Sequence, residues 1–294
     1  MDELRARLDA FARAYDRRHL GSDPLGIVRR FDRPEDLELV GLLAAGLAYG
    51  RVSSIRASLD SLLRVLGPRP GAFVEAYRPA TDARRFEGFR HRFTSGRDVA
   101  LLLHLVAQAR AARGPSLETL FLEGDADPSS PTLESAMDRF GDALFGFDAR
   151  PFLDGGRVPR RDGVRLLLPV PRNGSACKRH CLFLRWMVRP DDGLDLGLWS
   201  GVSPSRLVVP LDTHMERIAA ALGWTRRRSP GWRMALEVTA ALRNLDPEDP
   251  TRYDFPLSRL GILGIVRARG GRIRAGDVAA ILDAAGGETR CETP

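Results

Sequence analysis

Residues 205–224 read SRLVVPLDTHMERIAAALGW, an apolar segment followed by an amphipathic one. Thr213 and Glu216 have the S/T-x-x-E spacing of a capping box, so the pattern predicts a helix over 213–222 with Asp212 or Thr213 as its N-cap. A carboxylate in that position interacts favourably with the positive end of the helix. The stretch therefore predicts a fixed negative charge at Asp212, although an ordinary helix cap accounts for the same residues.

A second stretch, GSACKRH at 174–180, contains the only lysine of the chain. The chain has 45 lysine and arginine residues, so a bias towards arginine has replaced lysine at every other basic position. Arginine serves wherever a positive charge is sufficient, but it is not used as a nucleophile, whereas a desolvated lysine can be. Lys178 is therefore a candidate catalytic amine, and chance survival of one lysine is the alternative.

The surroundings of Lys178 predict a helix opening. The residues PRNGSACKRHCLFLRWMVR, 171–189, begin with a polar turn and continue with a broad apolar face, which predicts a helix over 175–188. Gly174 and Ser175 would lie at its N-terminus, where free backbone N–H groups suit a phosphate. An ordinary capped helix is the alternative. The candidate phosphate partners, which are equally candidates for solvated surface, are Arg172, Arg179 and Arg185.

Hydrophobic periodicity predicts a mainly α fold. Only the segment 164–170, VRLLLPV, has the pattern of an extended strand. Arginine-rich segments at 226–228 and 267–274 are expected either to contact a DNA backbone or to be solvated. The predicted helices cover residues 35–49, 52–66, 97–112, 133–144, 175–188, 213–222, 232–245 and 276–284.

Composition narrows the class of protein. A length of 294 residues with 44% hydrophobic residues is enough for one large or two medium domains, and the net charge of +7 favours a nucleic acid over a membrane as partner. No apolar run approaches the ~20 residues of a membrane span, and residues 1–19 predict a charged amphipathic helix rather than a signal peptide. Three cysteines are too few for a disulfide framework. We therefore expect a cytoplasmic protein that does not bind membranes.

A metal site is the main rival to an amine chemistry. Cys177, His180 and Cys181 share one helix face, and His214 comes near them if the two helix openings meet. Three ligands within one turn are crowded for tetrahedral zinc, and the chain contains no C-x-x-C pair. We therefore expect neither a metal nor another cofactor.

An amine and a fixed carboxylate at two helix openings suit cleavage of an N-glycosidic bond. The carboxylate stabilises positive charge on the sugar or activates the nucleophile, while the amine attacks the anomeric carbon. The string VVPLDTHMERIAAALG resembles the loop-to-helix segment of the helix-hairpin-helix (HhH-GPD) DNA glycosylase superfamily, in which P-V-D-T-H-x-x-R supplies an essential aspartate. Bifunctional members carry an upstream lysine that forms a Schiff base. The resemblance puts the aspartate at Asp212 and the lysine at Lys178.

The resemblance includes two departures. The usual hairpin L-P-G-V-G-x-K is replaced by LPVPRNGSACK, residues 168–178, so a modified hairpin is expected. The interval of 34 positions from Lys178 to Asp212 is longer than in most of the superfamily, and an archaeal 8-oxoguanine glycosylase branch resembles the chain in this respect. From about residue 20 to 265, the chain also resembles a bacterial domain family of unknown function, through LAYGR, GSACKR, LRWMVR, PLDTH and YDFPLSRLG.

These resemblances imply a two-lobed helical fold with a catalytic cleft between the lobes. Residues 31–200 would form a helical barrel lobe with the hairpin-like element, and residues 1–30 plus 201–294 the second lobe with the aspartate helix. The implied function is excision of a damaged base, such as an oxidised one, from duplex DNA by a monomer, with lyase activity through Lys178. The residues expected to contact DNA are Gly174, Ser175, Arg172 and Arg179, and those expected in the cleft are Arg51, His214 and Arg217.

Two other functions stay open at this point. One is a nucleic-acid-binding protein that keeps the fold without catalysis, for which an amine at Lys178 has no advantage over arginine. The other is a Schiff-base enzyme that acts on a small nucleoside or carbonyl compound and needs no DNA.

Overall fold

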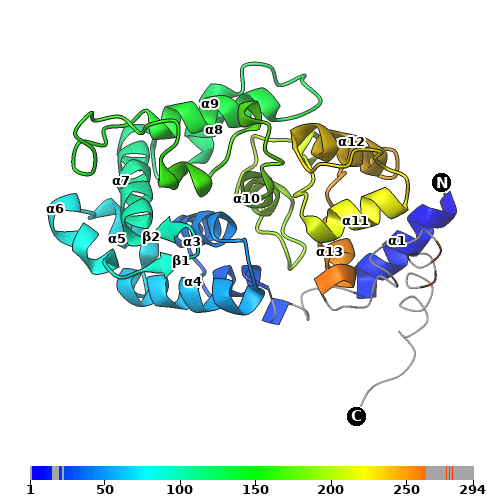
Figure 1. Cartoon of the computed structure of the whole chain (residues 1–294), viewed down its shortest axis with the longest axis horizontal. Coiled ribbons are helices and arrows are strands. Elements are labelled where there is room, and N and C mark those ends of the chain that lie inside the picture. The colour runs from blue at the N-terminus through cyan, green and yellow to red at the C-terminus, as the bar shows by residue number, and fades with distance from the viewer. Residues whose placement is uncertain are drawn as a thin grey trace, which may run out of the picture.

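The computed structural model describes residues 2–14, 20–21, 23–262, 276, 278 and 280, and these residues are mostly helical (Figure 1). The predicted mainly α class is therefore confirmed. Within the described residues the α-helices are α1 (Asp2–Ala14), α2 (Leu25–Val28), α3 (Pro34–Gly46), α4 (Val52–Leu66), α5 (Pro70–Glu75), α6 (Pro79–Asp82), α7 (Gly96–Arg113), α8 (Glu118–Gly124), α9 (Glu134–Phe145), α10 (Lys178–Val188), α11 (Thr213–Ala221), α12 (Trp232–Arg243) and α13 (Asp254–Ile262). Strands β1 (Arg90–His91) and β2 (Thr94–Ser95) form an antiparallel hairpin.

Helix α3 forms the centre of the hydrophobic core. Its residues from Leu39 to Gly46 are all buried, as expected for a helix that is apolar on every side. Helix α10 packs directly against it (Figure 1). Gly41 permits this contact, because a Cβ atom there would lie 2.9 Å from Cε of Met187. The close packing of α3 on α10 sets the position of the first turn of α10, where Lys178 lies.

A buried carboxylate ties α3 to its neighbours. Glu38 accepts hydrogen bonds from Nε1 of Trp199 at 2.8 Å and from the hydroxyl of Ser116 at 2.7 Å. It also accepts from the backbone N–H of Leu117 at 3.0 Å and from Nη2 of Arg110 at 3.0 Å. A buried charge of this kind is tolerated because each of its oxygens has partners.

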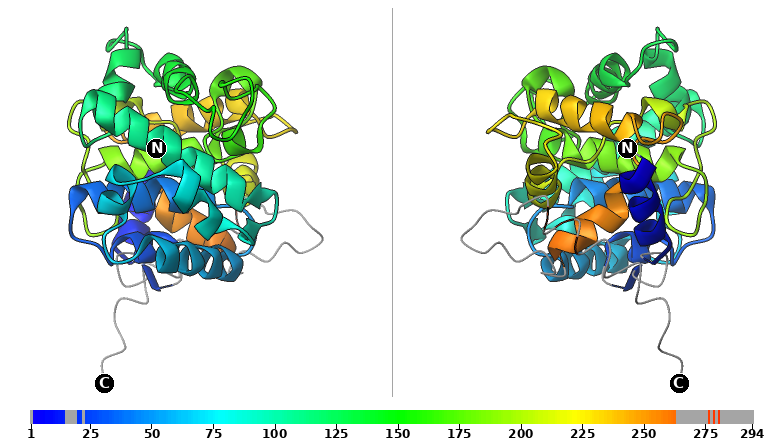
Figure 2. Two further views of the ribbon diagram at one scale, coloured as in Figure 1. Left: turned by 90° about the vertical axis from the view of Figure 1, so that its left-hand side faces the viewer. Right: turned by 90° about the vertical axis from the view of Figure 1, so that its right-hand side faces the viewer.

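Helices from both ends of the chain meet beside this core. Helix α11 packs against α13, and α13 contacts α1, so residues near the N-terminus pack on the helix that holds α11 (Figures 1 and 2). The hydroxyl of Tyr253 donates to Oδ1 of Asp9 at 2.7 Å across this contact. Helix α10 lies between this group and the helices α3 to α9 (Figure 1).

Two sequence predictions of local structure were wrong. The segment 164–170 is not a strand, because Gly163–Leu166 forms a 3-10 helix capped by the side chain of Asp162, which accepts from the N–H of Val164. The helix predicted over 175–188 begins three residues later, at Lys178, since Cys177 has a left-handed backbone with φ of 51°.

Other predictions fall partly outside the described residues. In the predicted helix 276–284, only residues 276, 278 and 280 are described, and they are helical. The arginine-rich segment 267–274 lies outside the described residues. The segment 226–228 is exposed, with Nε of Arg227 2.7 Å from Glu237. Among the described helices, none combines the length and the apolar character needed to cross a membrane.

Candidate active site

Lys178 is the first residue of α10, and the turn before it is tightly bent. Residues Pro171–Asn173 form a 3-10 turn, and Gly174 follows with φ of 74°, a conformation that glycine adopts without strain. Cys177 has φ of 51°, which is uncommon for a residue other than glycine. Both left-handed residues lie directly before α10, the helix that begins at Lys178 and packs on α3.

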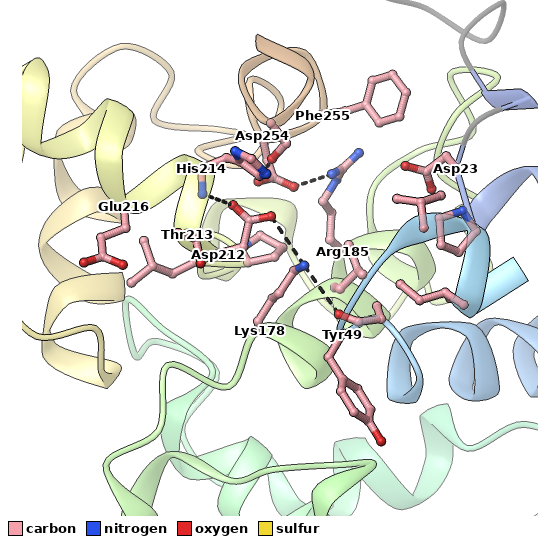
Figure 3. A pocket seen from close by; sticks show the side chains of 18 of the residues that line it. Asp23, Tyr49, Lys178, Arg185, Asp212, Thr213, His214, Glu216, Asp254 and Phe255 are labelled. Atoms are coloured by element: carbon pink, nitrogen blue, oxygen red, sulfur yellow. Dashed lines mark hydrogen bonds and ion pairs between the residues drawn. The ribbon is translucent and has the colours of Figure 1, made fainter. Parts of the chain in front are cut away.

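Asp212 is the N-cap of α11, which decides between the two predicted caps. Its Oδ1 accepts hydrogen bonds from the backbone N–H groups of His214 and Met215, both at 2.9 Å. Its Oδ2 lies 3.4 Å from Nζ of Lys178 (Figure 3). The amine also lies 3.4 Å from the carbonyl oxygen of Ala48, two residues after the end of α3. The structure thus brings together the two residues that the sequence singled out.

The pair lies in a cavity of about 460 Å³, a size that suits a small organic group. The side chains of Lys178 and Asp212 are 34% and 16% exposed, so both are accessible but partly screened from water. Most of the cavity wall comes from residues 48–50 after α3, from the start of α4, from α10, and from the starts of α11 and α13. A substrate there would contact the amine and the carboxylate together.

A buried ion-pair network lies behind the pair. Arg185 donates to the carboxylates of Asp195 and Asp254, and Arg189 also donates to Asp195. Arg185 was a candidate phosphate partner or a solvated residue by sequence, and both interpretations were wrong. Its place on the inner face of α10 puts it in the protein interior, where the two aspartates balance its charge.

Asp254 is a functional candidate that the sequence reasoning missed. It begins α13, lines the cavity and accepts from Arg185 (Figure 3). Burial raises the pKa of Asp254 to about 6; Arg185 and Lys178 act to lower this pKa, and the negative charge of Asp212 acts to raise it. The sequence feature that could have identified Asp254 is its position in YDFPLSRLG, where it is a polar residue at the start of an apolar helix.

The other predicted cleft residues are placed differently. His214 lines the cavity from the first turn of α11, two residues after Asp212. Arg51, the N-cap of α4, and Arg217, on α11, are both exposed and are not among the residues that line it. The neighbouring cavity residue on α11 is Glu216 rather than Arg217, since successive helix positions point in different directions.

The residues predicted to contact DNA have different surroundings. Arg172 is held by two carboxylates of α9, at 2.6 Å from Asp142 and 3.4 Å from Asp138. The backbone N–H of Gly174 donates to the carbonyl oxygen of Pro171 at 2.8 Å, so this N–H is not free to bind a phosphate. Ser175 and Arg179 line a second cavity beside the first.

Of the residues considered as metal ligands, Cys177, His180 and Cys181 are buried, whereas His214 lines the cavity. Burial raises the pKa of Cys177 to about 12, and burial lowers the pKa of His180 to about 4. Nδ1 of His180 lies 3.2 Å from the carbonyl oxygen of Pro169. Within the described part of the chain, no group of three histidine, cysteine or acidic side chains is placed to hold a metal ion.

The chain belongs to a family of unknown function, because residues 23–263 match the family model described as protein of unknown function (DUF2400). This confirms the predicted membership in a domain family of unknown function. No curated protein and no solved structure matches the chain. The relation to the helix-hairpin-helix glycosylases stays a prediction.

Proposed function

We propose that this member of the DUF2400 family is a DNA base-excision glycosylase that forms a Schiff base through Lys178 and also acts as a lyase. The observation that carries the proposal is the position of the sole lysine of the chain, with Nζ 3.4 Å from the helix-capping carboxylate of Asp212 inside a cavity. Amine and carboxylate are the two groups that this reaction needs.

Lys178 and Asp212 together account for every proton transfer in the proposed reaction. Oδ2 of Asp212 takes a proton from the ammonium of Lys178, which frees the amine to attack C1′ of the damaged nucleotide. The bond from C1′ to the base breaks, its electron pair leaves with the base, and one Nζ proton passes to the base. The sugar ring then opens as the bond from C1′ to O4′ breaks, and Asp212 returns its proton to O4′. A protonated imine between Nζ and C1′ is left.

The proposal includes a two-lobed glycosylase-like fold with a modified hairpin. Residues 31–200 would form one lobe, and residues 1–30 plus 201–294 the other. The origin of the cavity wall supports this division, because Lys178 comes from the first segment, whereas Asp212 and Asp254 come from the second. A nucleotide must leave the duplex to reach such a cavity, as in other enzymes that act on a base. The net charge of +7 favours the approach of duplex DNA.

Borohydride trapping on a duplex with one abasic site tests the proposal. The abasic sugar presents an aldehyde, so Nζ adds to C1′, water leaves, and hydride reduces the imine to a stable amine link. The unmodified protein is expected to give a covalent protein–DNA adduct. Lys178→Arg keeps the positive charge and removes the nucleophile, so it should bind the duplex but form no adduct. Arg64→Gln, an exposed change on α4, is the control that keeps trapping.

The outcomes separate the candidate functions. An adduct that persists in Lys178→Arg would place the amine chemistry at another group, such as the N-terminus. Binding without any adduct in the unmodified protein would support the non-catalytic DNA-binding function instead. If borohydride links a small carbonyl compound to Lys178 but gives no adduct with DNA, the result would support the enzyme that acts on a small molecule. A panel of duplexes with single lesions then identifies the base.

A further inference from the structure

A second cavity, of about 320 Å³, adjoins the first. Ala48, Tyr49 and Lys178 line both, so the candidate nucleophile stands between the two spaces. A group bound in the second cavity would be a direct neighbour of the group attacked by the amine. The wall of the second cavity is mostly apolar and includes Phe93, Leu166, Pro169 and Ala176.

The second cavity has an exposed aromatic residue at its rim. Phe93 is 70% exposed and Leu166 is 41% exposed, and both line the cavity. They are two of the three large hydrophobic residues that are exposed in the described part of the chain, the third being Leu122. Clustered exposed apolar side chains beside a cavity are typical of a binding surface.

The position of Phe93 is set by the hairpin that carries it. Phe93 follows Arg92 in the two-residue turn between β1 and β2. The hydroxyl of Tyr49 lies 2.9 Å from the carbonyl oxygen of His91 and 2.6 Å from Oγ1 of Thr94, so it is bonded to both strands. The ring of His91 in turn lies 3.0 Å from the carbonyl oxygen of Tyr49. Tyr49 therefore anchors the hairpin beside Lys178.

The second cavity also has an unbalanced positive charge. The guanidinium of Arg179 lies over the ring of Tyr49, 4.9 Å from its centroid, and lines the cavity. Among the described residues it has no ion-pair or hydrogen-bond partner, in contrast to Arg172 with its two carboxylates. Burial lowers the pKa of Arg179, so a bound anion would relieve an unfavourable placement of its charge.

We propose that the second cavity binds the DNA nucleotide next to the one attacked by Lys178. Its base stacks on Phe93, and the phosphate between the two nucleotides contacts Arg179. Aromatic side chains hold unstacked bases in this way, and a guanidinium is the preferred partner of a phosphate. The inference rests on the proposed function, because it assumes that Lys178 acts on a nucleotide within DNA.

Photo-crosslinking tests the subsite without any reaction at Lys178. Duplexes carry a tetrahydrofuran abasic analogue, which has no aldehyde, and 5-iodouracil at one of the two flanking positions. Irradiation is expected to attach one of these flanking bases to Phe93, as identified by peptide mass spectrometry. Phe93→Ala should abolish this link and weaken binding of the duplex by about tenfold, in line with the loss of one stacked base.

Matched variants separate a subsite from a general surface effect. Arg179→Gln should weaken binding by about tenfold, whereas Arg64→Gln, which removes an exposed charge on α4, should change binding by less than about twofold. Leu122→Ala, an exposed apolar residue on α8, is the control for Phe93→Ala. All four positions are at least partly exposed, so the variants are expected to fold.

Crosslinks to other residues only, or unchanged binding by Phe93→Ala, would overturn the subsite. Borohydride trapping without a link to Phe93 overturns the subsite and leaves the proposed catalysis in place. A link to Phe93 without borohydride trapping supports the subsite while the proposed catalysis fails.

Discussion

The two carboxylate oxygens of Asp212 have separate roles with respect to Lys178. Oδ1 caps α11, and this contact turns Oδ2 towards Nζ of Lys178 at 3.4 Å. The cap is a local feature of α11, whereas the contact with the amine joins residues 34 positions apart in the sequence. Substitutions at Asp212 can therefore remove one role and keep the other.

Asp212→Asn is expected to fold normally and to lose most turnover. Asparagine caps helices about as well as aspartate, but it has no negative charge for the amine or the sugar. Single-turnover strand cleavage should fall by on the order of a hundredfold or more. Asp212→Ala should lose the same activity and also about 1 kcal/mol of unfolding free energy, measured by urea denaturation. Full activity in Asp212→Asn would exclude a role for the charge.

Glu38→Gln is expected to destabilise the fold strongly. The change leaves the buried guanidinium of Arg110 without its carboxylate, and loss of one partner of a buried pair costs about 3–5 kcal/mol. Glu123→Gln is the matched control. Glu123 pairs with Arg113, which lies on α7 like Arg110, but the side chains of both Glu123 and Arg113 are exposed. The control should cost about 1 kcal/mol or less. Equal losses in urea denaturation would contradict the assigned burial.

His180 is expected to make stability fall in mild acid. Burial lowers the pKa of His180 from 6.5 to about 4, so the unfolded chain binds a proton in this range that the folded chain does not. Stability therefore decreases as pH falls from about 6.5 to about 4, by on the order of 3 kcal/mol. His180→Gln cannot titrate, so the unfolding free energy of the unmodified protein relative to this variant should drop between pH 7 and pH 4.5. A constant difference would contradict the lowered pKa.

The contribution of Asp254 to the free energy of unfolding is expected to depend on pH in the opposite sense over the same range. Its pKa is raised from 3.8 to about 6, chiefly by burial, so the folded chain holds a proton more tightly than the unfolded chain. The resulting stability is fully present below about pH 3.8 and is lost as pH rises through about 6. The charged groups that act on Asp254 are Arg185, Asp212 and Lys178.

Asp254→Asn separates this effect from that of His180. The amide keeps an acceptor for Arg185 but does not titrate. Between pH 4 and pH 7, the stability of the unmodified protein should therefore fall relative to that of the variant. Urea denaturation at several pH values measures the difference, and a relative rise in this range would show that Asp254 is ionised at pH 4.

The sequence by itself determined the local features of the site. Mainly helical structure follows from hydrophobic periodicity, and the helix after Asp212 follows from capping residues that act within one turn. Lys178 was found because a bias towards arginine makes any retained lysine conspicuous. The errors at 164–170 and 175–177 have a local cause too, since a side-chain cap at Asp162 and a left-handed residue at Cys177 overrode the periodicity.

Only the tertiary structure decided which charges meet. Lys178 faces Asp212 because α10 packs on α3 while α11 is held by α13, and neither contact is visible in a linear pattern. The same packing buries Arg185 with Asp254 and places Arg179 over Tyr49, where no carboxylate of the described residues pairs with it. The hydrophobic periodicity of the sequence does not distinguish the buried Arg185 from Arg179. The partner of each arginine depends on long-range packing, which sequence spacing does not encode.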